Sequence, residues 1–174
     1  DLGFCGLYIP EQYGGLGLSR LDAAIVFEEL AAGCTSTTAY ITIHNMMTWM
    51  IATFAEPDVA AEWVPKLASG ALWGSYCLTE PGAGSDAASL KTRAERDGDH
   101  YLLNGSKMFI SGAGSTDALV VMARTGGAGP KGISAFLVPA NLPGIQYGKK
   151  EHKMGWNSQP TRAITFDNVA IPAA

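Results

Sequence analysis

Charged side chains are scarce in this chain. Only 16% of its 174 residues are Asp, Glu, Lys or Arg, whereas 47% are hydrophobic. Such a composition excludes an intrinsically disordered chain and suffices for a sizeable core in one or two domains. The formal net charge is −4 and no basic stripe is present, so there is no electrostatic reason to expect a nucleic-acid partner. A surface this poor in charge indicates that part of the chain packs against another structure.

Cysteine and long hydrophobic runs are also sparse. Cys5, Cys34 and Cys77 are an odd number without Cys-x-x-Cys spacing, so neither a disulfide framework nor a metal site is indicated. We expect three unpaired, mostly buried thiols in a reducing compartment. The longest apolar stretch, residues 37–55, is interrupted by polar side chains such as His44, so no membrane span is expected.

The first part of the chain has helical periodicity. Ser19 can cap a helix that ends near Gly33, a second helix is expected over about 36–54, and a third over 57–67. The second helix is apolar on most faces, which predicts that it is buried. On that helix His44 is interpreted as a core histidine with satisfied hydrogen bonds. Residues 1–70 are therefore expected to form part of an α-helical domain.

After residue 70 the hydrophobic period drops towards two, which is typical of strands. The dipeptide Asp97-Gly98 predicts a hairpin turn. The fold class expected is α+β, with a helical N-terminal part followed by an all-β barrel or sandwich of about seven or eight short strands over residues 71–174. The expected strands are residues 72–78, 89–95, 100–103, 107–111, 118–124, 133–139, 145–148 and 161–167.

Two segments carry the strongest functional signal. Residues 76–86 read YCLTEPGAGSD, and residues 104–112 read NGSKMFISG. Each combines an apolar strand with a turn of small residues, rich in hydroxyl groups and backbone N–H groups. If the two turns lie side by side, they could donate hydrogen bonds to the edge of a flat, polar, polycyclic ligand.

The run GAGSDA at residues 82–87 also matches a loose dinucleotide-binding pattern, G-x-G-x-x-G/A. A Rossmann site would need a helix after the glycines and a parallel partner strand. The hairpin at Asp97-Gly98 comes too early for such a crossover, because parallel strands need connections of a dozen or more residues. A Rossmann site is therefore disfavoured. Without the second segment, a plain Pro-Gly turn would explain the first equally well.

Together, the two segments resemble the paired flavin-contacting segments of the acyl-CoA dehydrogenase family. Three further stretches match that family in order, namely residues 9–17 (IPEQYGGLG), 153–156 (KMGW) and 166–172 (FDNVAIP). The resemblance covers nearly the whole chain. Residues 109–111 depart from the more usual Trp-Ile-Thr, and with residues 155–162 they are most similar to members that act on isobutyryl-CoA or a similar short branched thioester in valine breakdown.

The resemblance implies an FAD-dependent dehydrogenase and assigns its contact residues. Tyr76, Leu78 and Thr79 would contact the pyrimidine side of the flavin, and Phe109, Ile110 and Ser111 would approach its other edge and N5. Ser85 corresponds to the position that meets the acyl-CoA thioester. Without the resemblance, these residues would be read as core aromatics and turn hydroxyls.

No catalytic residue and no metal ligand is assigned within the chain. The family's catalytic Glu belongs to a C-terminal helical domain, which is expected to lie outside these residues. Glu80 is interpreted as structural rather than as a base, and Lys107 as a solvated strand residue. The resemblance also implies an electron-transferring flavoprotein as partner, a homo-oligomer at full length, and a cytoplasmic location in a bacterium or, alternatively, the mitochondrial matrix.

Two other functional readings remain open. The 174 residues could be a non-catalytic fragment that binds flavin, acyl-CoA or another protein. Alternatively, the full-length protein could be an oxygen-using flavin oxidase or monooxygenase of the same superfamily.

Overall fold

A computed structural model describes residues 2–173 of the chain. The chain divides into two compact units. The helical unit comprises Asp1–Gly74 with His152–Gln159, and the sheet unit comprises Ser75–Glu151 with Pro160–Ala174. Residues 152–159 lie within the part of the sequence that was expected to form the β domain, but they belong to the helical unit. There the Ser158 hydroxyl donates a hydrogen bond to the Ser36 hydroxyl.

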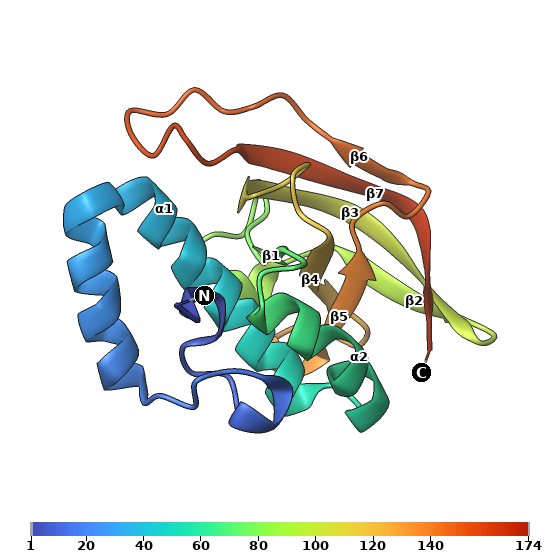
Figure 1. The fold of residues 1–174 in the computed structure, drawn as a ribbon. Helices are drawn as coiled ribbons and strands as arrows, with labels where there is room; N and C mark the ends of the chain where they lie inside the picture. Colours follow the sequence, from blue (N-terminus) through green and yellow to red (C-terminus); the bar gives the residue numbers. More distant parts are fainter. Residues whose placement is uncertain (1, 174) are drawn as a thin grey trace. The chain divides into compact units, whose positions relative to one another are not determined.

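The helical unit contains two short 3-10 turns, Phe4–Gly6 and Glu11–Tyr13, followed by helices α1 (Arg20–Phe54) and α2 (Pro57–Ala68). Ser19 caps α1 in a reciprocal capping box with Asp22. At Cys34 the backbone leaves helical geometry, with φ −156° and ψ 99°, and Figure 1 shows the two arms of α1 at an angle to each other. The expectation of two helices meeting just after Gly33 is therefore confirmed.

The second arm of α1 is less uniformly buried than its composition suggested. Phe54 is 72% exposed, whereas the polar side chains Asn45 and Thr48 are fully buried. Asn45 accepts a hydrogen bond from the Leu7 amide at 2.8 Å and donates to the Phe4 carbonyl at 2.8 Å. The arm therefore buries a polar stripe against the N-terminal turns, because those turns leave backbone groups that need partners.

His44 is confirmed as a core histidine. Its side chain is fully buried, and Nε2 lies 2.9 Å from the Leu67 carbonyl while Nδ1 accepts a hydrogen bond from the Gly74 amide at 3.2 Å. This arrangement requires the neutral ring with its proton on Nε2. Burial lowers the pKa of His44, although the Leu67 carbonyl acts in the opposite direction.

The sheet unit confirms the α+β fold class. Its strands are β1 (Gly74–Cys77), β2 (Arg93–Asp97), β3 (His100–Ser111), β4 (Ala118–Arg124), β5 (Ile133–Pro139), β6 (Ile145–Tyr147) and β7 (Thr161–Pro172). They form one seven-stranded sheet in the order β1-β4-β2-β3-β7-β6, with β5 paired to β4. The sheet is mixed, because β2 meets β4 in parallel while β3 pairs with β2 and β7 in antiparallel fashion. Figure 1 shows β3, β7 and β6 running side by side as a curled layer.

Several strand boundaries differ from the sequence-based expectation, including those of β1 and β6, which are shorter than the expected 72–78 and 145–148. Residues 100–103 and 107–111 belong to one strand, β3, which crosses the Asn104-Gly105 dipeptide through a register shift against β7. Residues 87–89 form a 3-10 turn, so β2 begins only at Arg93. Strand β7 continues to Pro172. The hairpin turn between β2 and β3 is confirmed, with Asp97 paired to His100 and Gly98 at φ 59°.

The core of the sheet unit is a single cluster of buried side chains from all parts of the sheet except β6. Its members are Cys77, Ala94, Leu103, Ile110, Ala113, Leu119, Val121, Ala123, Val138, Ala140, Ile164, Phe166, Val169 and Ile171. One predicted cofactor residue, Ile110, and the neighbour of another, Cys77, belong to this cluster. The predicted site is therefore connected directly to the packed core of the sheet.

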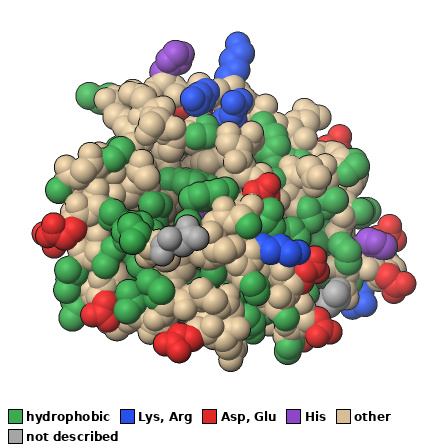
Figure 2. Space-filling view, viewed as in Figure 1, with side chains coloured by type: hydrophobic (Ala, Val, Ile, Leu, Met, Phe, Trp, Pro, Cys, Tyr) green, Lys and Arg blue, Asp and Glu red, His purple; other side chains and the backbone are tan. Residues whose placement is uncertain are grey.

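Several large hydrophobic side chains are exposed on the surface. Figure 2 shows groups of hydrophobic side chains between a few charged ones on the visible face. In α1, Leu21 and Ile25 are 70% and 54% exposed.

The three cysteines are unpaired, as expected, but only Cys77 is buried. Cys34 is exposed where α1 bends, so the expectation of mostly buried thiols is wrong. Within residues 2–173, no group of His, Cys, Asp and Glu is arranged to hold a metal ion. In the same part of the chain, no helix combines the length and apolarity that crossing a membrane requires.

The environment of His44 predicts a pH dependence of stability. The folded-state pKa of His44 is lowered. Below about pH 6.5 this histidine is therefore protonated in the unfolded chain but stays neutral in the folded one, which favours unfolding. The thermal midpoint of the full-length protein should fall between about pH 7.5 and about pH 5.5. The fall should be smaller in His44→Gln, whose amide can also donate to Leu67 and accept from Gly74. Equal falls in both proteins would contradict this account.

The register shift in β3 predicts a strict requirement for glycine at position 105. Gly105 has φ +145°, and a Cβ there would lie 2.7 Å from the Thr92 Cα. Gly105→Ala should therefore lower the free energy of unfolding by more than about 2 kcal/mol. Gly127→Ala, in an open loop position, is the matched control and should change it by less than about 0.5 kcal/mol. Denaturant titration of both variants measures the difference.

Candidate functional site

The two segments singled out in the sequence lie in direct contact. The Met108 amide, in the second segment, donates a hydrogen bond to the Thr79 carbonyl in the first at 2.8 Å. The Ser75 hydroxyl donates to the Ser111 carbonyl at 2.7 Å. The expectation that the two turns lie side by side is therefore confirmed.

A buried ion pair joins the same two segments. Lys107 Nζ lies 2.8 Å from Glu80 Oε1 and donates to the Leu78 carbonyl at 3.0 Å. Lys107 is fully buried and Glu80 is 8% exposed. The interpretation of Lys107 as a solvated residue is wrong, because β3 turns this side chain inward at the point where its register against β7 changes.

Glu80 has a structural role, as the sequence indicated. Its Oε2 accepts from the Lys91 amide at 2.6 Å, and Oε1 accepts from the Thr92 amide at 2.9 Å. Burial by itself would raise the pKa of Glu80, but the hydrogen bonds from Lys107, Thr92 and Lys91 together lower the pKa below its usual value. Burial lowers the pKa of Lys107, while Glu80 opposes that change.

This pair sets the direction of the peptide group between Leu78 and Thr79. The described peptide bonds are all trans, so the N–H of Thr79 points away from the Leu78 carbonyl that Lys107 holds. Within residues 2–173, the structure shows no hydrogen bond donated by the Thr79 amide. This N–H group can therefore donate a hydrogen bond to a ligand.

The residues of the second segment differ in which groups a ligand could contact. Phe109 has φ 59° and is 59% exposed, a left-handed conformation that is strained for an aromatic residue. Such strain is concentrated at ligand sites in proteins. Ile110 is buried in the core, so it can offer a ligand only its main chain. Ser111 is half-buried and its carbonyl is already bonded to Ser75.

The remaining predicted residues lie on the first segment. Tyr76, Leu78 and Thr79 are half-buried, and Ser85 is exposed. Burial raises the pKa of the Tyr76 phenol, and the neighbouring Cys77 adds to the effect. The tyrosine therefore stays protonated at neutral pH and remains able to donate a hydrogen bond.

A pocket of about 800 Å³ opens immediately after Ser85. It is lined by Asp86, Ala88, Ser89, Leu90, Lys91, Arg93, Arg124, Gly126, Gly127, Ala128 and Gly129. This pocket was not predicted from the sequence, although residues 126–129 read GGAG, a composition typical of a loop. Its lining residues lie before β2 and after β4, two strands that meet in parallel at Arg93 and Arg124.

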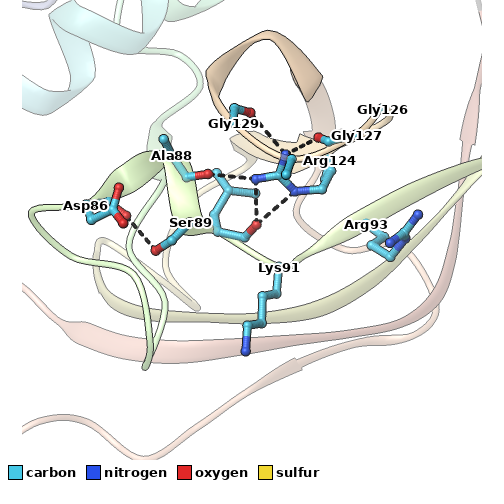
Figure 3. Close-up of a pocket in the computed structure, with 11 residues that line it drawn as sticks. Asp86, Ala88, Ser89, Lys91, Arg93, Arg124, Gly126, Gly127 and Gly129 are labelled. Carbon is cyan, nitrogen blue, oxygen red and sulfur yellow. Dashed lines mark hydrogen bonds between the residues drawn. The ribbon is translucent and has the colours of Figure 1, made fainter.

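Arg124 holds the two walls of the pocket together. Its guanidinium donates to the Ala88 carbonyl at 2.8 Å and to the Leu90 carbonyl on one side, and to the Gly127 and Gly129 carbonyls on the other. Figure 3 shows these bonds converging on Arg124, with the Lys91 side chain pointing away from it. Lys91 and Arg93 also line the pocket, and the guanidinium of Arg93 forms an exposed ion pair with Glu95, with Nε 3.2 Å from Oε1.

The residues present fit the edge of a flavin ring. They offer an amide donor with no acceptor at Thr79, hydroxyl groups at Thr79 and Ser111, and an exposed aromatic ring at Phe109. A flavin has hydrogen-bond acceptors along one edge and flat apolar faces, so these groups are chemically complementary to it.

Comparison with known proteins gives the same assignment. Residues 1–71 match the model of the "Acyl-CoA dehydrogenase, N-terminal domain", and residues 75–169 match the model of the "Acyl-CoA dehydrogenase, middle domain". The mitochondrial isobutyryl-CoA dehydrogenase of Bos taurus is 57% identical over 100% of this chain and 42% of its own length.

Solved structures agree with this match. A glutaryl-coenzyme A dehydrogenase in complex with glutaryl-CoA has a TM-score of 0.94 and 39% identity, over 99% of this chain and 45% of that one. A glutaryl-CoA dehydrogenase of Mycobacterium smegmatis in complex with FADH2 has a TM-score of 0.91 and 32% identity, over 99% of this chain and 44% of that one. The chain thus spans less than half the length of these relatives. The chain belongs to the acyl-CoA dehydrogenase family.

Proposed function

We propose that the chain is the flavin-contacting portion of an FAD-dependent dehydrogenase that oxidises a short branched acyl-CoA, such as isobutyryl-CoA. One observation carries the proposal. The Met108–Thr79 hydrogen bond joins the two segments, and beside that bond the Thr79 amide and the Phe109 ring are left available to a ligand. The identity to the bovine isobutyryl-CoA dehydrogenase supports the substrate class.

The contacts divide between the two segments. Tyr76, Leu78 and Thr79 hold the pyrimidine side of the flavin through main-chain and hydroxyl groups. Phe109 covers an apolar part of the ring, and Ser111 approaches N5. Because Ile110 is buried in the core, it contributes through its main chain. Donors at the pyrimidine side favour the reduced cofactor, since negative charge accumulates there on reduction.

The reaction makes a double bond between Cα and Cβ of the thioester. A carboxylate takes the proton from Cα, and Cβ loses a hydride. When bound, the flavin supplies the two-electron acceptor for that hydride at N5. The residues of this chain orient the ring and the thioester and exclude water from one side. We propose that the carboxylate belongs to a part of the protein outside this chain.

The acyl-CoA lies along the segment that follows the flavin contacts. Ser85 meets the thioester portion, and the pocket beyond it receives the charged portion of coenzyme A. Lys91 and Arg93 line that pocket and match the negative charge of phosphate groups. The full-length protein is proposed to be a homo-oligomer that passes electrons to an electron-transferring flavoprotein. The mitochondrial location of the bovine relative favours the mitochondrial matrix over a bacterial cytoplasm.

The reaction class is tested with the full-length protein. The purified protein should be yellow, and its flavin absorbance near 450 nm should bleach when isobutyryl-CoA is added without oxygen. Retention of the colour with every short acyl-CoA would refute the substrate class. Fast reoxidation of the reduced flavin by oxygen in stopped-flow measurements would favour an oxidase instead.

The pocket assignment predicts a substrate-specific loss. Lys91→Met combined with Arg93→Met should raise KM for isobutyryl-CoA by about tenfold, because each exposed charge pair with a phosphate contributes up to about 1 kcal/mol. Steady-state kinetics with isobutyryl-pantetheine, which lacks the nucleotide phosphates, should show little change. A matched control is Lys150→Met, an exposed position outside the pocket. Equal losses with both substrates would contradict the assignment.

A further inference from the structure

We propose that Lys107 is a positioning residue for the flavin site: it holds the Leu78 carbonyl and thereby aims the Thr79 amide at the cofactor. The inference rests on the proposed function and adds to it a residue that touches neither flavin nor substrate. Lys107 instead contacts Leu78 and Glu80.

The first step is the cost of burying Lys107. Its side chain is 0% exposed, and removing an ammonium group from water costs several kcal/mol before partners compensate. Apolar residues of similar volume usually stabilise a core at least as well as a buried ion pair. Packing alone therefore does not explain a lysine at this position. The ammonium group must contribute through its hydrogen bonds to Leu78 and Glu80.

The second step is the spacing of the two contacts. The Lys107 side chain holds the carbonyl of Leu78, and the amide of the next residue, Met108, holds the carbonyl of the next residue, Thr79. Two consecutive carbonyls of one segment are thus fixed by two consecutive residues of the other. The peptide between Leu78 and Thr79 cannot rotate without breaking one of these bonds.

The third step is the consequence for the ligand. Because that peptide is trans, fixing its carbonyl also fixes the direction of the Thr79 N–H. The same two residues of β3 are followed directly by Phe109 in its left-handed conformation. Lys107 and Met108 therefore set the position of the Thr79 donor relative to the Phe109 ring. A rigid planar ligand can contact both groups only when this relative position is correct.

Glu80 has a separable part in this arrangement. Besides Lys107, its carboxylate accepts from the Lys91 and Thr92 amides, whereas the Leu78 carbonyl is held by Lys107. Glu80→Gln keeps the Lys107 contact to Leu78 but leaves the buried ammonium group without its counter-charge, so it should lower the thermal midpoint. Glu80→Gln/Lys107→Met removes that contact without leaving a buried charge unpaired, so this pair of variants isolates the positioning effect from the general loss of an ion pair.

The variants are compared in the full-length holoprotein, with Lys150→Met as the surface control. The double variant should bind FAD at least tenfold more weakly, by fluorescence titration of the apoprotein, with an altered visible flavin spectrum. Its flavin potential should become more negative, by about 30 mV for each tenfold loss in the preference for the reduced form in a two-electron couple. Glu80→Gln should stay within about threefold of the unmodified protein in FAD affinity.

A second measurement needs no variant. In hydrogen exchange, a peptide beginning at Cys77 loses label from its first two amides, so its next two report Thr79 and Glu80. The Glu80 amide is already bonded to the Ala83 carbonyl. Binding of FAD should therefore slow exchange in this peptide at Thr79 alone.

The outcomes separate the two claims. Equal shifts in Glu80→Gln and the double variant, or no protection of Thr79 by FAD, would overturn the positioning role while leaving the dehydrogenase assignment intact. If the double variant fails to fold by circular dichroism, the exchange result decides alone. A full-length protein that binds no FAD and does not bleach would refute the proposed function itself, and with it this inference.

Discussion

The buried Lys107 side chain, which donates to the Leu78 carbonyl and pairs with Glu80, is the constraint on which the candidate site depends. It joins the segment that follows β1 to strand β3, more than twenty residues later in the sequence. The sheet brings their backbones together, but the hydrogen bonds from Lys107 to Leu78 and from Met108 to Thr79 decide which groups point inward. What remains directed outward is the Thr79 amide, and a flavin would require a donor of that kind. The hydrogen bonds that satisfy the buried polar groups thus leave the Thr79 amide free for a ligand.

This arrangement requires two local departures from regular strand geometry. Gly105 adopts a φ of +145° beside Thr92, and Phe109 adopts a φ of 59°. They flank Lys107 on either side, where β3 changes register against β7. A straight strand would place every second side chain on the same face. The irregular strand instead buries Lys107 and presents Phe109 to a ligand within three residues.

Much of this organisation follows from local sequence patterns. Strands β4 and β5 were predicted with their observed bounds, and the Asp97-Gly98 turn with its hairpin, because alternation and turn chemistry act over a few residues. The contact between the two functional segments followed from their composition and from the family resemblance.

Contacts between residues far apart in the sequence could not be predicted from local patterns. A lone lysine in a strand is usually solvated, and only the three-dimensional position of Glu80 shows why Lys107 is not. The pocket near Arg124 was missed for the same reason, since its walls meet through the parallel contact of β2 with β4. The charged residues that partner each other across the fold carry no local signal. In this chain, what sequence reasoning missed is chiefly the pairing of buried polar groups.

The most direct test of the account is a crystal structure of the full-length protein with FAD. The account predicts that the Thr79 amide and the Ser111 main chain or hydroxyl lie within hydrogen-bond distance of the isoalloxazine ring, and that the Phe109 side chain contacts it. A ring bound elsewhere, with both segments facing solvent, would contradict the central claim.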